Sequence, residues 1–118
     1  MEFQQAIQDM IYFSDQVKDL DRALISMEGQ CQREMQEHVD NGLIAFAVAK
    51  SIHEHLLHMA RIRTDIADAE QKILEAKTYL QEALRPFQGL RIVYDFSSDK
   101  VAGRTYQVFL EEDLVKFV

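Results

Sequence analysis

Residues 43–87, LIAFAVAKSIHEHLLHMARIRTDIADAEQKILEAKTYLQEALRPF, carry the longest regular pattern in this chain. Apolar residues recur in it at intervals of seven, in two rows set three residues apart. A repeat of about 3.5 residues keeps one stripe of a helix facing a partner helix, so the stretch predicts a long helix in a coiled coil. The first row is Ala45, Ile52, Met59, Ile66, Ile73, Leu80 and Phe87, and the second is Val48, His55, Ile62, Ala69, Ala76 and Ala83.

Residues 3–39 carry a matching apolar seam. Between the two seams lies Asp40-Asn41-Gly42, and because Asn and Gly tolerate positive φ, this segment predicts a turn. Two helices, at about 3–39 and 43–85, therefore form a long antiparallel helical hairpin over residues 1–87. The seam of the first helix consists of Phe3, Met10, Val17, Leu24 and Cys31, with Ala6, Phe13, Leu20 and Met27 three residues after the first four.

Residues 88–118 predict a small β-hairpin appendage, so that the chain is mainly α. Leu90 to Phe96 alternates apolar and polar side chains as a strand does, and Arg104 to Leu110 offers a second strand after a loop over Ser97–Gly103. A lone two-stranded hairpin is marginally stable in water. The apolar tail, Leu114–Val118, fits either a third strand or a short helix.

The charge is negative and uneven. The net charge is −7, and residues 1–42 hold three Lys or Arg against nine Asp or Glu. An acidic first helix repels phosphate groups, so we expect no binding to nucleic acid or to anionic membranes. It would instead suit a basic protein partner.

Cysteine usage and the N-terminus predict a cytoplasmic protein. The single cysteine, Cys31, cannot form an internal disulfide, which favours a reducing compartment. The opening MEFQQAIQDM has neither a basic segment nor a long apolar run, so we expect no signal peptide or membrane span.

Three histidines form the one cluster with metal-ligand chemistry. His55 and His58 are three residues apart and Glu54 and His58 are four apart, so each pair can share a face of the helix, and Cys31 lies on the facing helix. These four residues, His53, His55, His58 and Cys31, are candidate ligands for Zn²⁺ or Ni²⁺. The spacing is not that of HExxH, and the alternative interpretation makes His55 a polar seam residue that fixes the pairing of the helices.

The seam leaves apolar surface unexplained between Leu43 and Ala60. Leu43, Phe46, Leu56 and Leu57 fall off the seam, and the facing part of the first helix is too polar to cover them. A helix that is apolar around much of its circumference is buried on several sides. We therefore expect self-association through these four residues, as a homodimer or higher homo-oligomer.

The sequence contains no Gly-rich phosphate loop, no GxSxG elbow and no CxxC pair. We therefore expect a non-enzymatic protein-interaction module without a cofactor, acting as an adaptor, chaperone, inhibitor or assembly component. The alternative hypothesis is a small metal-binding or metal-responsive protein that uses the histidine cluster. Because the open edges of a β-hairpin can accept a partner strand, the candidate partner-binding residues are those of the appendage: Tyr94, Phe96, Tyr106 and Phe109.

Overall fold

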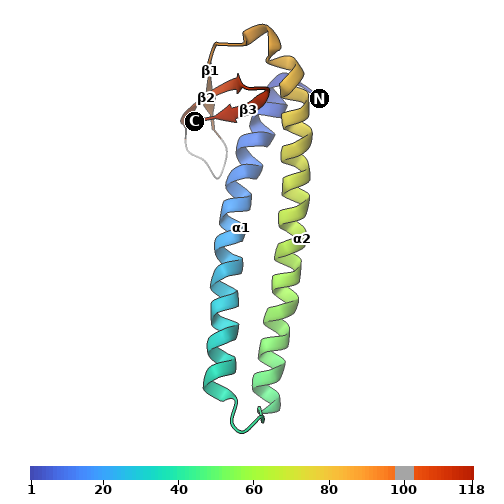
Figure 1. Ribbon diagram of the computed structural model, residues 1–118, viewed down its shortest axis with the longest axis vertical. Helices are drawn as coiled ribbons and strands as arrows, with labels where there is room; N and C mark the ends of the chain where they lie inside the picture. Colours follow the sequence, from blue (N-terminus) through green and yellow to red (C-terminus); the bar gives the residue numbers. More distant parts are fainter. Residues whose placement is uncertain (98–102) are drawn as a thin grey trace. The chain divides into compact units, whose positions relative to one another are not determined.

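The chain folds as a helical hairpin followed by a three-stranded antiparallel sheet, which confirms the predicted fold class (Figure 1). The computed structural model describes residues 1–97 and 103–118. The loop predicted over Ser97–Gly103 falls mostly on residues outside this description. The elements are α1 (Phe3–His38), α2 (Phe46–Ala83), the short 3₁₀ helix η1 (Arg85–Phe87), β1 (Ile92–Phe96), β2 (Arg104–Glu111) and β3 (Leu114–Phe117).

Two compact units divide the chain, and they do not follow the expected division at residue 87. The first, which we call the turn unit, comprises Asp15–Ala69. The second, the sheet unit, comprises Met1–Ser14 together with Glu70–Val118. The boundary cuts both helices because the sheet shares a hydrophobic core with the start of α1 and the end of α2. The C-terminal strands thus belong to the same compact unit as the start of α1 and the end of α2.

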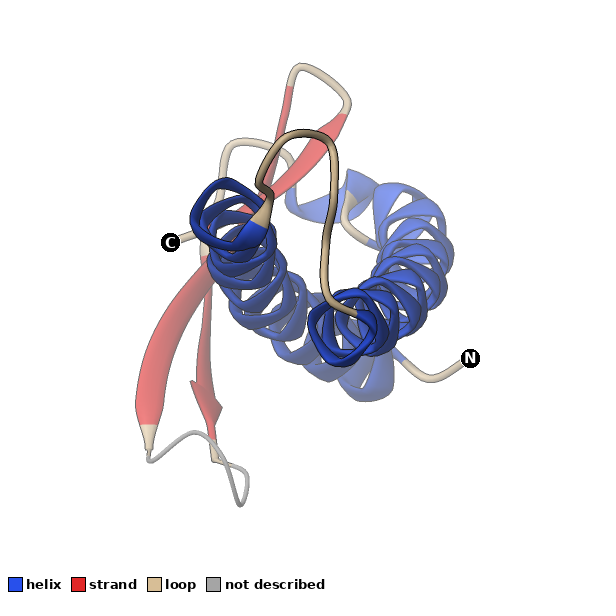
Figure 2. Cartoon of the chain, turned by 90° about the horizontal axis from the view of Figure 1, so that it is seen from below, coloured by secondary structure: helices blue, strands red, loops and turns tan. Residues whose placement is uncertain are grey.

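In the turn unit, parts of α1 and α2 run side by side (Figure 2). The α2 seam residues from Val48 to Ala69 are all buried or half-buried, and His55 is half-buried among them. Cys31 is also buried, at 7% exposure. A 3.5-residue apolar repeat thus produced the helix pairing that it predicts.

The two helices are joined by a tight β-turn at Asn41-Gly42. Both residues have positive φ, 50° and 74°. The flanking residues Asp40 and Leu43 exchange two backbone hydrogen bonds, of 2.9 and 2.8 Å. Asn-Gly favours such a turn because neither residue resists a left-handed backbone. Since Leu43 pairs across the turn, α2 begins at Phe46 rather than at the predicted residue 43.

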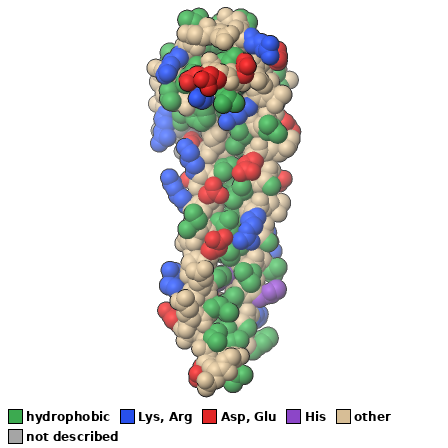
Figure 3. Space-filling model, in the orientation of Figure 1, with side chains coloured by type: hydrophobic (Ala, Val, Ile, Leu, Met, Phe, Trp, Pro, Cys, Tyr) green, Lys and Arg blue, Asp and Glu red, His purple; other side chains and the backbone are tan. Residues whose placement is uncertain are grey.

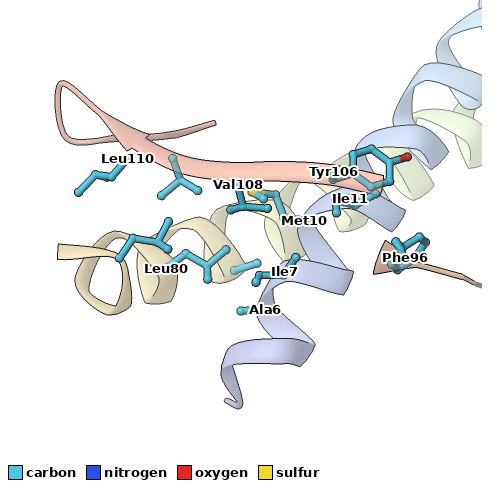
Figure 4. Close-up of a cluster of buried hydrophobic side chains, with 12 residues drawn as sticks. Ala6, Ile7, Met10, Ile11, Leu80, Phe96, Tyr106, Val108 and Leu110 are labelled. Atoms are coloured by element: carbon cyan, nitrogen blue, oxygen red, sulfur yellow. The ribbon is translucent and has the colours of Figure 1, made fainter. Parts of the chain in front are cut away.

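The sheet unit is built around the apolar face of the sheet. The strands lie in the order β1-β2-β3, with Tyr94 opposite Tyr106 and Leu110 opposite Val115. Alternate residues of β2 point toward the helices, where Val108 packs among the side chains of Figure 4 and is fully buried. The core combines Ala6, Ile7, Met10 and Ile11 of α1, Ala76 and Leu80 of α2, Leu84, and Phe96, Tyr106, Val108, Leu110 and Val115 of the sheet.

The C-terminal tail forms a third strand, which decides between the two alternatives that its sequence left open. β3 pairs with β2, and Val118 continues the pairing by exchanging backbone hydrogen bonds with Gln107. The turn between these strands is Glu112-Asp113, and both residues have positive φ, 52° and 61°. The acidic cluster thus closes a hairpin instead of opening a helix.

Candidate interaction surface

Seven exposed apolar side chains lie between residues 35 and 57, on both sides of the turn at Asn41-Gly42. We call them the turn surface, and all belong to the turn unit. Phe46 is 82% exposed and Leu43 is 74% exposed, whereas Leu56 and Leu57 are each about half exposed. Figure 3 shows apolar side chains on the molecular surface at this end. The turn surface consists of Met35, Val39, Leu43, Ile44, Phe46, Leu56 and Leu57.

The local structure explains why these side chains are not covered. Leu43 and Ile44 lie between the tight turn and the start of α2, outside either helix. Leu56 and Leu57 come one and two residues after the seam residue His55, and successive residues of an α-helix are about 100° apart, so both leucines turn away from the seam. Clusters of exposed apolar side chains of this kind mark interaction sites on soluble proteins.

All four residues predicted for self-association belong to the turn surface, and three further members were not predicted. Met35, Val39 and Ile44 are exposed at 47%, 41% and 36%. Met35 and Val39 lie beside the end of the α1 seam in sequence. That drift of the apolar row away from its seven-residue interval was the signal that could have found them.

The histidine cluster does not converge on one point. Among residues 1–97 and 103–118, no group of three or more His, Cys, Asp or Glu side chains is placed to hold a metal ion. His53 and His58 are exposed, and Cys31 is buried in the seam. His55 faces Glu34 instead, with its Nδ1 atom 3.7 Å from the Glu34 Oε2 atom.

The pair formed by His55 and Glu34 is a polar contact within the apolar seam. Both side chains are about three-quarters covered. Neither His55 Nδ1 nor Glu34 Oε2 has a hydrogen-bond partner among the described residues. A small cavity of about 220 Å³ adjoins this region, lined by Glu34, His38, Ala47, Val48 and Ser51. The contact matches the interpretation of His55 as a polar seam residue more closely than that of a metal ligand.

The charged side chains of the turn unit are mostly exposed. Arg63 of α2 pairs with Glu28 of α1 at 3.3 Å, and both side chains are about half exposed, so the ion pair contributes little to stability. The acidic residues Asp19, Asp21 and Glu37 of α1 are exposed as well.

The aromatic residues predicted to bind a partner are mostly covered by the chain itself. Phe96 and Tyr106 belong to the core of the sheet unit, at 3% and 9% exposure. Tyr94 is half-buried, and its hydroxyl accepts a hydrogen bond of 2.8 Å from Gln8 Nε2. Phe109 lies under the Arg91 guanidinium, 4.2 Å from the ring centroid. Phe96, Tyr106 and Tyr94 pack on the face of the sheet that the helix ends cover, whereas Phe109 lies on the other face against Arg91. All four side chains therefore make contacts within the sheet unit.

A second apolar feature lies in the sheet unit, between α2 and the β2–β3 turn. It is a groove of about 360 Å³ beside the turn residue Asp113, whose carbonyl oxygen accepts a hydrogen bond of 2.9 Å from Gln81 Nε2. Leu74 and Leu114 line it and are 58% and 60% exposed. This groove was not predicted, because it depends on the position of a strand that the sequence left undecided.

No helix in the described part of the chain combines the length and apolar character that crossing a membrane requires. Comparisons of the chain with protein-family models, with curated proteins and with solved structures found no match.

Proposed function

We propose that this chain is a non-enzymatic protein-interaction module that self-associates through the turn surface. The observation that carries the proposal is the exposure of Phe46, Leu43, Leu56 and Leu57 within one compact unit. Burying an exposed leucine or phenylalanine side chain is worth about 1.5–3 kcal/mol, so covering several of them supplies a strong driving force for association. A second copy of the chain brings the same surface and is always present.

A non-enzymatic role is the second part of the proposal. It rests on the sequence, which contains none of the phosphate-binding, nucleophile-elbow or paired-cysteine patterns described above. The buried state of Cys31, the one cysteine, is compatible with a cytoplasmic location.

A further partner would be a basic protein. The exposed carboxylates of Asp19, Asp21 and Glu37 support this part of the proposal, since complementary charge steers protein association. Capture of such a partner should weaken steeply as the ionic strength rises, whereas contacts made by the turn surface should not.

The test is the oligomeric state of matched variants in solution. Phe46→Glu places a charge in the turn surface, and Ile25→Glu makes the same change at an exposed apolar residue of α1 outside that surface. Light scattering behind a sizing column should give an oligomer for the wild-type chain and for Ile25→Glu, but a monomer for Phe46→Glu. If Phe46→Glu remains fully oligomeric, the turn surface is not the interface.

A further inference from the structure

β1 is an edge strand of the three-stranded sheet, so only one of its sides is paired. Val93 lies opposite Gln107 of β2, and Gln107 exchanges both of its backbone hydrogen bonds with Val118 on its other side. Opposite residues of antiparallel strands alternate between hydrogen-bonded and non-hydrogen-bonded pairs. The N–H and C=O groups of Val93 therefore point away from β2, toward the open edge, and so do those of Asp95, two residues further along.

The open edge of β1 is exposed. Val93 is 65% exposed, and Asp95 is exposed as well. Among residues 1–97 and 103–118, neither residue makes a backbone hydrogen bond to an element outside the sheet. A row of outward N–H and C=O groups on an edge strand is a template for pairing with a further strand.

The charges around Val93 complement an antiparallel copy of the same strand. When Val93 lies opposite Val93 of the second copy, Arg91 lies opposite Asp95 on both sides of this centre. Arg91 shares a face of the sheet with Val93, because it donates a hydrogen bond of 3.0 Å to the Oε1 atom of Gln107, which lies opposite Val93. Asp95 is on that face by the two-residue period of a strand. Neither charge forms an ion pair among the described residues, so this alignment gives each one a partner of opposite sign.

The other face of β1 agrees with the same alignment. It sets Ile92 opposite Tyr94, and Leu90 opposite Phe96, so that apolar side chains meet apolar side chains. Other alignments lose this match. A shift of the register by two residues sets the apolar Val93 opposite Asp95, and a parallel copy in register sets each charge beside its own kind.

We propose that β1 pairs with antiparallel β1 of a second copy about a two-fold axis at Val93, which makes a continuous sheet with three strands from each chain. The two Val93 residues exchange two backbone hydrogen bonds, and each Arg91–Asp95 pair adds two more. This interface lies in the sheet unit and is independent of the turn surface.

The proposed pairing is weak, because one short strand pair buries far less than the roughly 1,200 Å² of a stable interface. We expect a dissociation constant of about 1 mM. At the dilution of a sizing column the edge therefore stays unpaired. At high concentration it joins copies that the turn surface has already paired.

Amide hydrogen exchange in the Phe46→Glu variant tests the pairing without the turn surface. Between about 0.01 and 1 mM, half of the chains should pair, so exchange of the Val93 amide should slow about twofold. The Tyr94 amide is the internal control, because it faces β2 and should be equally protected at every concentration. Sedimentation equilibrium of the same samples should show the average mass rising toward twice that of the chain. A Val93 amide that exchanges at one rate throughout would overturn the proposal.

Val93→Pro in the same background tests which side of β1 associates. The substitution removes only an N–H that points away from β2, and proline is tolerated at such positions of edge strands. The variant should keep the urea midpoint of its parent but stay monomeric at 1 mM, whereas Val93→Thr, which retains the N–H, should pair as before. Asp95→Arg, which leaves the backbone unchanged, should also abolish pairing, and adding Arg91→Asp should restore it. Association that survives Val93→Pro or Asp95→Arg would refute this interface.

Discussion

Truncating Leu80 tests the finding that the sheet and the helix ends share one core. Leu80 is fully buried, and it belongs to the same core as Met10 of α1 and Val108 of β2. Leu80→Ala removes the equivalent of three methylene groups, worth about 0.8 kcal/mol each, and leaves a cavity whose walls relax only in part. The expected loss in the free energy of unfolding is about 3–5 kcal/mol.

The matched control is Leu74→Ala, the same substitution six residues earlier in the same helix. Leu74 is 58% exposed, so less than half of its side-chain surface is buried in the folded chain. Leu74→Ala should therefore lower the free energy of unfolding by less than about 1 kcal/mol. Urea titration followed by circular dichroism measures both variants. In addition, Leu80→Ala should lower the amide protection of β2 as well as that of α2, because the two elements share this core. Equal costs for the two variants, or a loss of protection confined to α2, would refute the shared core.

Two further predictions concern backbone conformation and use the same urea titration. Gly42→Ala should lower the free energy of unfolding by about 1 kcal/mol, because Gly42 has a φ of 74°, and this strain arises although no atom lies within 4 Å of the added Cβ. Gly29→Ala inside α1 should instead raise the free energy of unfolding by about 0.5–1 kcal/mol, because Ala favours a helix more than Gly does. A Gly42→Ala variant as stable as the wild type would contradict the turn geometry. Replacing Glu112-Asp113 by Asn-Gly should stabilise the sheet unit by about 1 kcal/mol, because both positions have positive φ and Asn-Gly is the favoured pair for such a hairpin turn. A lower urea concentration at the midpoint of unfolding would show that the turn has another conformation.

The helical hairpin could be predicted because its signal is long and regular. The seam from Val48 to Leu80 is buried or half-buried along α2, with His55 in place among its apolar residues. The Asn41-Gly42 turn was predictable for the same local reason, since its residue types favour positive φ. Both features depend on interactions between residues close in sequence, and a single sequence predicts such local interactions best.

The division of the chain could not be predicted from the seam alone. Its signal was present in α1, where Ile7 and Ile11 are fully buried although neither lies on the seven-residue rows. Together with Ala6 and Met10, they make the start of α1 apolar on a wider face than one partner helix requires. This excess indicates a second covering element, and the sheet is that element.

The partner-binding prediction for the aromatic residues had a different weakness. Alternation in a strand separates two faces but does not say which of them is covered, so Phe96 and Tyr106 could have faced either solvent or a core. The surplus of apolar residues at Leu43, Phe46, Leu56 and Leu57 was a stronger signal. These residues are exposed in the structure, as the pattern predicted.

Self-association implies that a second copy of the chain covers the turn surface. Sedimentation equilibrium of the wild-type chain, over about a hundredfold range of concentration, tests it most directly. Self-association through the turn surface predicts a reversible increase to twice the chain mass of 13.7 kDa. A mass of 13.7 kDa at every concentration, with the helices intact by circular dichroism, would contradict it.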